Sequence, residues 1–233
     1  MKTIVAILIG LLTASGSAWG AREVVVADLT GTVQVRRGVE ETWTDAKQGM
    51  ALYRVDTIET GKGSEVILKT EGAERFVLPE EAMLEISALE PMTKERLFLF
   101  LMSQKVARMD AGKEPIRLRN GSVPRGAMRS EEPKSTKTRD PKERDLKRFH
   151  GAKALFDNGF VPNAAAAFRK LLDGAGSKRT SWQDRAQWTM AESFRTLEWF
   201  GKAREAYTEL VDAYPQSALC EAARKRIAEL EKD

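Results

Sequence analysis

A run of short apolar stretches separated by glycines begins with Thr30-Gly31-Thr32-Val33-Gln34-Val35-Arg36-Arg37-Gly38 and continues through Trp43, Gly49 and Leu52 to Val55-Asp56-Thr57-Ile58-Glu59-Thr60-Gly61. Apolar and polar side chains alternate over residues 32–36, which is the period of a strand with one buried face. The glycines recur at intervals that suit turns between short strands. The stretch therefore predicts a small antiparallel sheet folded on itself.

The residues that follow first extend this pattern and then leave it. Ser64–Thr70 and Glu74–Leu78 flank Glu71-Gly72, which predicts a hairpin because glycine supplies the positive φ of a tight turn. From Pro91 the period changes, and proline suits the first turn of a helix. We therefore predict a helix near residues 92–109, packed on the sheet.

Two points in this region stay open. Residues 97–101 fit either that helix or a buried strand, because a short apolar run suits both. Residues 115–118 are a candidate last strand. With these elements, a β-domain is predicted over residues 21–126.

The first 20 residues have the parts of a cleavable export signal. Lys2 precedes a mostly apolar core, and the small residues Ala18 and Gly20 suit cleavage before Ala21. The alternative is a short membrane anchor, but the core is shorter than the roughly 20 apolar residues that cross a bilayer. We expect residues 1–20 to be removed and the remaining chain to be exported with no transmembrane segment.

Composition excludes some classes of partner. The formal net charge is +4 over 233 residues, and the basic residues are interleaved with acids, so nucleic acid is not expected. Residues 127–146 are charged and have almost nothing apolar to bury, which predicts a flexible linker. An alternative for this segment is a docking site for an anionic polymer.

From residue 147 to residue 233 the chain is predicted to be helical and repetitive. Five positions have a counterpart 39 residues later, with two helices in each unit and a capping helix at the end. The pairs are Leu155 and Phe194, Phe160 and Trp199, Ala164 and Ala203, Phe168 and Tyr207, and Leu172 and Val211.

The β-rich part resembles the FecR domain, most clearly in the run from Val55 to Gly61 with Ser64 after it. The resemblance implies a periplasmic β-domain that contacts proteins or envelope polymers. FecR itself carries a cytoplasmic segment before a membrane span. This chain begins instead with a signal peptide, so only the periplasmic binding module carries over.

The helical part resembles the tetratricopeptide repeat. The residues that match are Ala164 and Ala203, the large residues Phe168 and Tyr207, and Pro215 after the second unit. The family's repeat has 34 residues. The resemblance is closest to the periplasmic repeat domains of Tol-Pal coordinators, and it implies a protein-binding array. The predicted fold class is thus α+β multidomain, a FecR-like β-domain followed by an all-α helical solenoid.

The sequence offers little for catalysis, metals or cofactors. His150 is the only histidine and Cys220 the only cysteine, so neither a histidine cluster nor an internal disulfide can form. Gly61-Lys62-Gly63-Ser64 lacks the glycine that a phosphate-binding loop needs at position 56. We predict a protein without enzymatic activity, without a metal site and without a cofactor.

The aromatic residues of the helical part suggest where a partner binds. Most must form the core, but two units leave one face of the array open. We predict that Trp188, Trp199 and Phe200 contribute to a groove for a protein or peptide partner. The function expected is a periplasmic adaptor that binds an envelope component through the β-domain and a protein through the repeats. The alternative is a module that senses a ligand or glycan.

Overall fold

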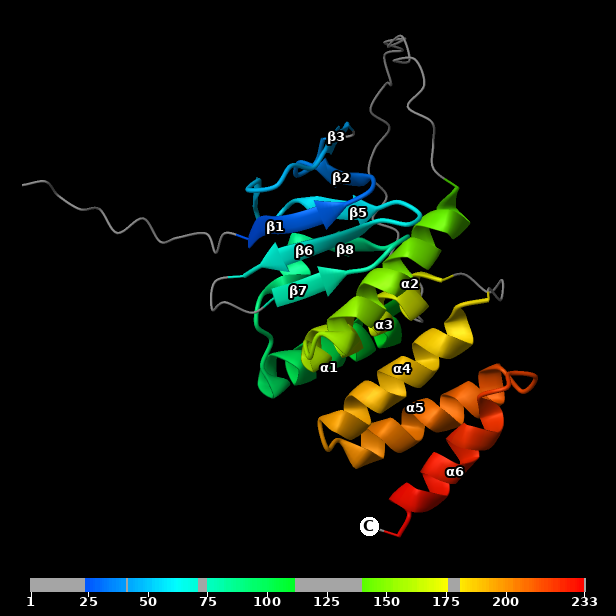
Figure 1. Ribbon diagram of the computed structural model, residues 1–233. Helices are drawn as coiled ribbons and strands as arrows, with labels where there is room; N and C mark the ends of the chain where they lie inside the picture. Colours follow the sequence, from blue (N-terminus) through cyan, green and yellow to red (C-terminus); the bar gives the residue numbers. More distant parts are fainter. Residues whose placement is uncertain (1–23, 41, 71–74, 112–139, 176–180, 233) are drawn as a thin grey trace, which may run out of the picture.

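The computed structural model describes residues 24–40, 42–70, 75–111, 140–175 and 181–232. The predicted signal peptide, the candidate strand at 115–118 and residues 127–139 of the predicted linker lie outside these ranges. Within them, eight strands are followed by six α-helices. The α+β class and its order, β-part first, are therefore confirmed (Figure 1).

The strands form two four-stranded antiparallel sheets with the orders β4-β1-β6-β7 and β3-β2-β5-β8. The predicted hairpin of residues 64–78 is the β6–β7 pair, in which Val66 lies opposite Leu78. The bounds are β1 Val24–Thr30, β2 Val33–Arg36, β3 Trp43–Asp45, β4 Ala51–Leu52, β5 Thr57–Thr60, β6 Glu65–Lys69, β7 Arg75–Leu78 and β8 Met83–Glu85.

The inner faces of the two sheets contribute to one core. Val26 and Leu68 from the first sheet and Val35 and Ile58 from the second are all fully buried, and all four belong to the same apolar cluster. Alternate residues of β2 and β6 are buried, because successive side chains of a strand point to opposite faces. The period-two pattern of the sequence is thus realised.

A short 3-10 helix at Ile86–Leu89 leads from β8 to α1, which spans Lys94–Ala111. Residues 97–101 are helical, so the strand alternative for them is wrong. Leu97 and Leu101 are buried. The inner face of α1 packs mainly against α3 rather than against the sheet.

Two helical hairpins follow. The first consists of α2, Pro141–Asp157, and α3, Val161–Gly174; the second consists of α4, Gln183–Thr196, and α5, Phe200–Ala213. Both ends of α3 and α5 are 39 residues apart, and so are the C-terminal ends of α2 and α4. A last helix, α6, spans Cys220–Leu230.

The turns of the two hairpins share their hydrogen bonds. The N–H of Phe160 donates to Leu155 O at 2.8 Å, and the N–H of Trp199 donates to Phe194 O at 2.9 Å. Gly159 and its counterpart Glu198 both have positive φ. The 39-residue repeat seen in the sequence is therefore a repeat of backbone structure.

The start of α2 differs from the predicted boundary at residue 147. Asp140 caps the helix by accepting from the N–H of Lys142 at 3.0 Å, and Pro141 opens it. Both features favour a helix start at this point. Residues 141–146, assigned to the linker from their charge, therefore lie in α2.

The helical part lies directly on the β-part, through α2 (Figure 1). Gly151 of α2 approaches Met83 of β8 so closely that a Cβ at this position would lie 2.0 Å from Met83 O. Nearby, Lys147 Nζ lies 2.7 Å from Glu59 Oε1, and both side chains are largely buried. The buried residues of the two parts form one continuous apolar cluster.

Candidate partner-binding surfaces

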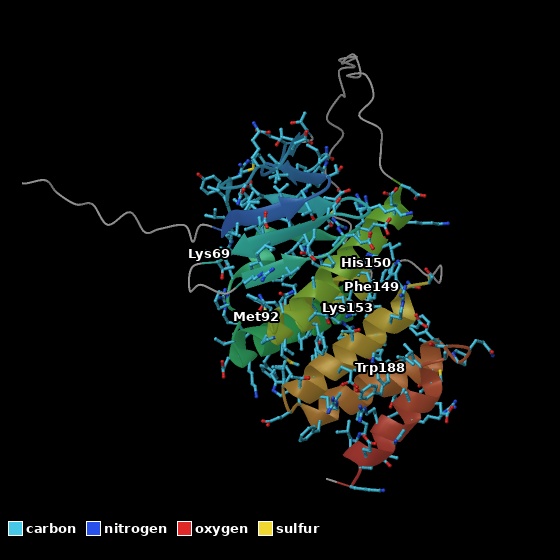
Figure 2. All side chains as sticks on the ribbon, in the orientation of Figure 1. Lys69, Met92, Phe149, His150, Lys153 and Trp188 are labelled. Carbon is cyan, nitrogen blue, oxygen red and sulfur yellow. The ribbon has the colours of Figure 1, made fainter. Side chains whose placement is uncertain are left out.

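The structure places Trp188 on α4 of the second hairpin, partly buried and packed against the apolar core. Its ring lies 5.3 Å from the ring of Tyr207. The equivalent pair in the first hairpin is Phe149 and Phe168, at 6.1 Å, and Phe149 is 2% exposed. Figure 2 labels Phe149 on α2 and Trp188 on α4. Trp188 therefore occupies the repeat position of the buried Phe149 but is itself only partly buried.

Trp199 and Phe200 lie together, where α4 turns into α5. Trp199 is half-buried and stacks on Phe194, with ring centroids 6.2 Å apart. Phe200 is 43% exposed. Trp188 lies in the body of α4, so the structure joins Trp199 to Phe200 and separates both from Trp188.

The exposed large apolar side chains of the described residues fall into two groups. One group lies at the loop ends of the β-part, and the other lies on α1 and at the start of α5. The first comprises Val39, Tyr53 and Val55; the second comprises Phe98, Leu99, Val106 and Phe200.

The outer face of α1 carries an apolar stripe between charged residues. Phe98, Met102 and Val106 recur every four residues, so they form one stripe along the helix. Leu99, which is 66% exposed, lies beside this stripe. Exposed apolar side chains gathered on one face of a helix often mark an interaction site. The outer face of α1 is therefore the strongest indication of a missing partner.

The start of α5, which carries Phe200, lies near the start of α1. Lys94 Nζ lies 3.9 Å from Glu198 Oε2, so the start of α1 is beside the α4–α5 turn. Phe98 follows Lys94 by one helical turn, and Phe200 follows Glu198 by two residues. We call Phe98, Leu99, Met102, Val106 and Phe200 the α1–α5 surface. Sequence reasoning found Phe200 alone, because the α1 residues were assigned to packing on the sheet.

The first group, Val39, Tyr53 and Val55, lies beside a buried carboxylate that connects its two loops. Asp56 is 2% exposed and accepts from the N–H of Tyr53 at 2.9 Å and the N–H of Gly38 at 3.2 Å. It also pairs with the guanidinium of Arg37. These bonds tie the β2–β3 and β4–β5 loops together. We call Val39, Tyr53 and Val55 the loop-end cluster.

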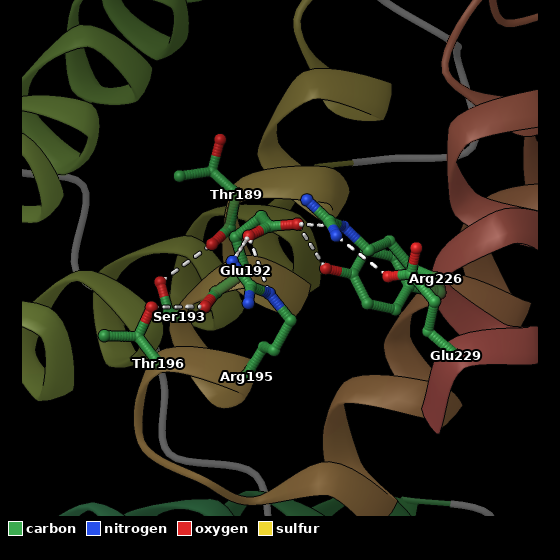
Figure 3. Close-up of polar contacts among 8 residues, drawn as sticks. Thr189, Glu192, Ser193, Arg195, Thr196, Arg226 and Glu229 are labelled. Carbon is green, nitrogen blue, oxygen red and sulfur yellow. Dashed lines mark hydrogen bonds and ion pairs between the residues drawn. The ribbon is translucent and has the colours of Figure 1, made fainter. Parts of the chain in front are cut away.

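A polar network joins α4, α5 and α6 (Figure 3). Glu192 accepts from the hydroxyl of Tyr207 and from Arg195 Nη2 at 2.7 Å, and it pairs with Arg226 at 3.4 Å. Burial, together with the hydrogen bond to Glu192, raises the pKa of Tyr207 above its usual range. Each charge in the network has a neighbour of opposite sign, so the network fastens α6 to the second hairpin.

His150 and Cys220, the two residues most often considered for catalysis, both make contacts with the backbone of neighbouring elements. The ring of His150 is hydrogen-bonded through Nδ1 to Glu81 O at 2.9 Å. Cys220 is buried, and its Sγ lies 3.1 Å from Tyr214 O. Across the described ranges, no group of three or more His, Cys, Asp and Glu side chains is placed to hold a metal ion. Likewise, no helix in those ranges has the length and apolarity needed to cross a membrane.

Comparison with known proteins adds no relative. No family model, no curated protein and no solved structure matches this chain. We therefore infer function from the α1–α5 surface and the loop-end cluster.

Proposed function

We propose that this protein is a non-enzymatic adaptor that binds other proteins through the α1–α5 surface and an envelope component through the loop-end cluster. The observation that carries the proposal is the apolar outer face of α1. Exposed apolar residues gathered on one face are typical of interaction sites. Aromatic anchors such as Phe98 and Phe200 are among the side chains that supply most binding energy.

The sequence resemblances place this adaptor in a biological setting. We assign the β-part to a FecR-like binding module and the two helical hairpins to a tetratricopeptide-like array. The repeated turn geometry of the hairpins supports the second assignment. With cleavage of residues 1–20, the protein would act in the periplasm, where both resemblances have their closest counterparts.

The proposed adaptor has its two surfaces on one rigid body. The ion pair of Lys147 with Glu59 and the close approach of Gly151 to Met83 fix α2 on the sheets. A flexible tether, as expected from the sequence, would let the two surfaces move independently toward their partners. The docked arrangement instead fixes the orientation of the two partners relative to each other. Once one partner is bound, the effective concentration of the second rises at a defined position.

The alternative of a glycan sensor is less well supported. Sugars are commonly held on exposed aromatic faces, and the candidates in the β-part are Trp43 and Tyr53. The guanidinium of Arg36 lies over Trp43 at 5.6 Å, and that of Arg37 lies over Tyr53 at 5.9 Å. One face of each ring is thus already covered, which favours the adaptor.

The test compares two matched variants of the full chain. Leu99→Glu places a charge on the α1–α5 surface, and Thr208→Glu places one on an exposed position of α5 outside it. Affinity purification from native extracts, with quantitative mass spectrometry, should recover a defined protein with the wild type and with Thr208→Glu but not with Leu99→Glu. Equal recovery with both variants, each shown to be folded by circular dichroism, would contradict the proposal.

A further inference from the structure

We infer that the α1–α5 surface binds an amphipathic helix of a partner protein, and that acidic residues border the apolar stripe of that helix. The inference rests on the proposed function and adds the chemistry of the partner. It follows from the shape of the stripe and from the charges beside it. Those charges also disfavour a symmetric pair of two copies of this chain.

The shape of the surface suits a helix. Phe98, Met102 and Val106 stand on successive turns of α1 and form a straight ridge about 12 Å long, given the 1.5 Å rise per residue. Ridges of this kind fit the grooves between side chains of a facing helix at an interaxial distance of roughly 8–10 Å. Leu99, beside the ridge on α1, would widen the contact.

The charges beside the stripe are mostly positive. Lys94 and Lys105 are exposed and lie on one border of the stripe, because they are three turns apart, or about 16 Å along the axis. Arg96 is exposed near the opposite border. Lys94 also lies 3.9 Å from the exposed Glu198, so acidic side chains on a partner helix, spaced by about three turns, would compete with Glu198 for Lys94 and would also meet Lys105. Such complementarity chiefly gives specificity and speeds association.

These charges argue against a second copy of this chain as the occupant. In a two-fold symmetric pair of antiparallel helices, each border of the stripe faces the same border of its partner. Lys94 of one copy would then lie near Lys105 of the other. Like charges at such positions are destabilising, so the surface is poorly suited to self-association.

One acid in α1 argues against an anionic membrane surface. Glu95 lies two turns before Met102, so its carboxylate points along the stripe itself. The hydrogen bond from Thr93 lowers the pKa of Glu95, which keeps it charged at neutral pH. A helix lying in an anionic bilayer surface would press this charge against lipid phosphates. A partner helix can instead place a polar or basic residue there and keep its acids beside Lys94 and Lys105.

The test uses two synthetic helical peptides that carry the same leucine stripe. One has Glu at the positions bordering the stripe, and the other has Lys there. Binding to the full chain is measured by fluorescence polarisation. We expect the Glu peptide to bind roughly tenfold more tightly than the Lys peptide, which corresponds to about 1.4 kcal/mol. The double variant Lys94→Glu/Lys105→Glu should reverse this preference, whereas Lys225→Glu on α6 should leave it unchanged.

Other outcomes overturn the inference. Equal affinity for both peptides, or failure of the Glu peptide to bind, would show that the assigned chemistry is wrong; the purification experiment with Leu99→Glu would still decide the proposed function separately. Binding to phosphatidylserine vesicles that Phe98→Ser abolishes, without binding of the Glu peptide, would identify a lipid surface. A dimer in sedimentation velocity that Phe98→Ser dissociates would identify a second copy.

Discussion

The side chain of Asn158 pairs with both backbone groups of Val77. Its Oδ1 accepts from the N–H of Val77 at 2.9 Å, and its Nδ2 donates to Val77 O at 3.0 Å. Val77 lies on β7, the last strand of its sheet, so its outward backbone groups have no strand to pair with. The turn between α2 and α3 therefore closes this sheet edge and joins the two parts of the molecule.

Replacing Asn158 tests this closure. In Asn158→Ala, the N–H and C=O of Val77 lose their partners, and we expect a loss of about 1–3 kcal/mol in the free energy of unfolding. Urea denaturation followed by circular dichroism measures it. Asp157→Ala is the control, because its exposed ion pair with Lys153 should contribute less than about 0.5 kcal/mol. Equal stability of Asn158→Ala and the control would show that the clamp is not needed.

The contact of α2 with β8 gives a second prediction. Gly151→Ala would force a methyl group against Met83 O, and both groups belong to backbone that cannot move independently. We expect a loss of about 3 kcal/mol, at the upper end of overpacking effects. Gly201→Ala is the matched control, because nothing lies within 4 Å of the Cβ position there. Unchanged thermal stability of Gly151→Ala would mean that α2 does not sit on β8 as described.

The different settings of Trp188 and Phe200 predict different defects. Trp188→Ala removes a partly buried ring that packs on Tyr207 and should cost about 2–3 kcal/mol in stability. Phe200→Ala removes a half-exposed ring and should cost less than about 1 kcal/mol while weakening partner recovery. Chemical denaturation and affinity purification of both variants check this. The opposite pattern, with Phe200 needed for folding and Trp188 for binding alone, would contradict this expectation and support the groove predicted from the sequence.

Tyr207 makes stability sensitive to alkaline pH. Its pKa in the folded protein is raised above the ordinary value of 10.0 by burial and by Glu192. The stability it contributes is therefore fully present below pH 10 and is lost as the pH rises, because the unfolded chain releases the proton first. We expect the wild type to lose up to about 1.4 kcal/mol per pH unit more than Tyr207→Phe between pH 10 and pH 12.

Tyr207→Phe should be tolerated structurally, because Phe168 fills the same position in the first hairpin. At neutral pH the loss of the hydrogen bond to Glu192 should cost about 1–2 kcal/mol. Parallel pH dependences of the two proteins, measured by urea denaturation at each pH, would show that Tyr207 does not titrate differently on folding.

Local sequence patterns predicted the elements well. The alternation at residues 32–36 became β2, and Glu71-Gly72 separates the paired strands β6 and β7. The 39-residue offset located both helical hairpins, because a repeated backbone turn needs similar residues at similar positions. Charge alone placed residues 141–146 in the linker, although Asp140 and Pro141 are a helix start signal that could have corrected it.

Contacts between distant segments could not be predicted in this way. Nothing local in the sequence pairs Asn158 with Val77 or brings Gly151 against Met83, since these contacts depend on how two parts dock. The outer face of α1 was missed for a related reason. The spacing of Phe98, Met102 and Val106 was visible, but only the structure shows that Leu97 and Leu101 already supply the buried face. The groove at Trp188 and Trp199 stays a prediction, because an aromatic on a helix looks the same in a core and in a groove.

The most direct test of the account is photocrosslinking in intact cells with a photoreactive residue at Phe98 or at Phe200. Thr208, exposed on α5 outside the α1–α5 surface, is the control position. The account predicts that Phe98 and Phe200 capture the same protein, that Thr208 does not, and that Leu99→Glu abolishes both crosslinks. Capture of unrelated species from Phe98 and Phe200, or equal capture from Thr208, would contradict it.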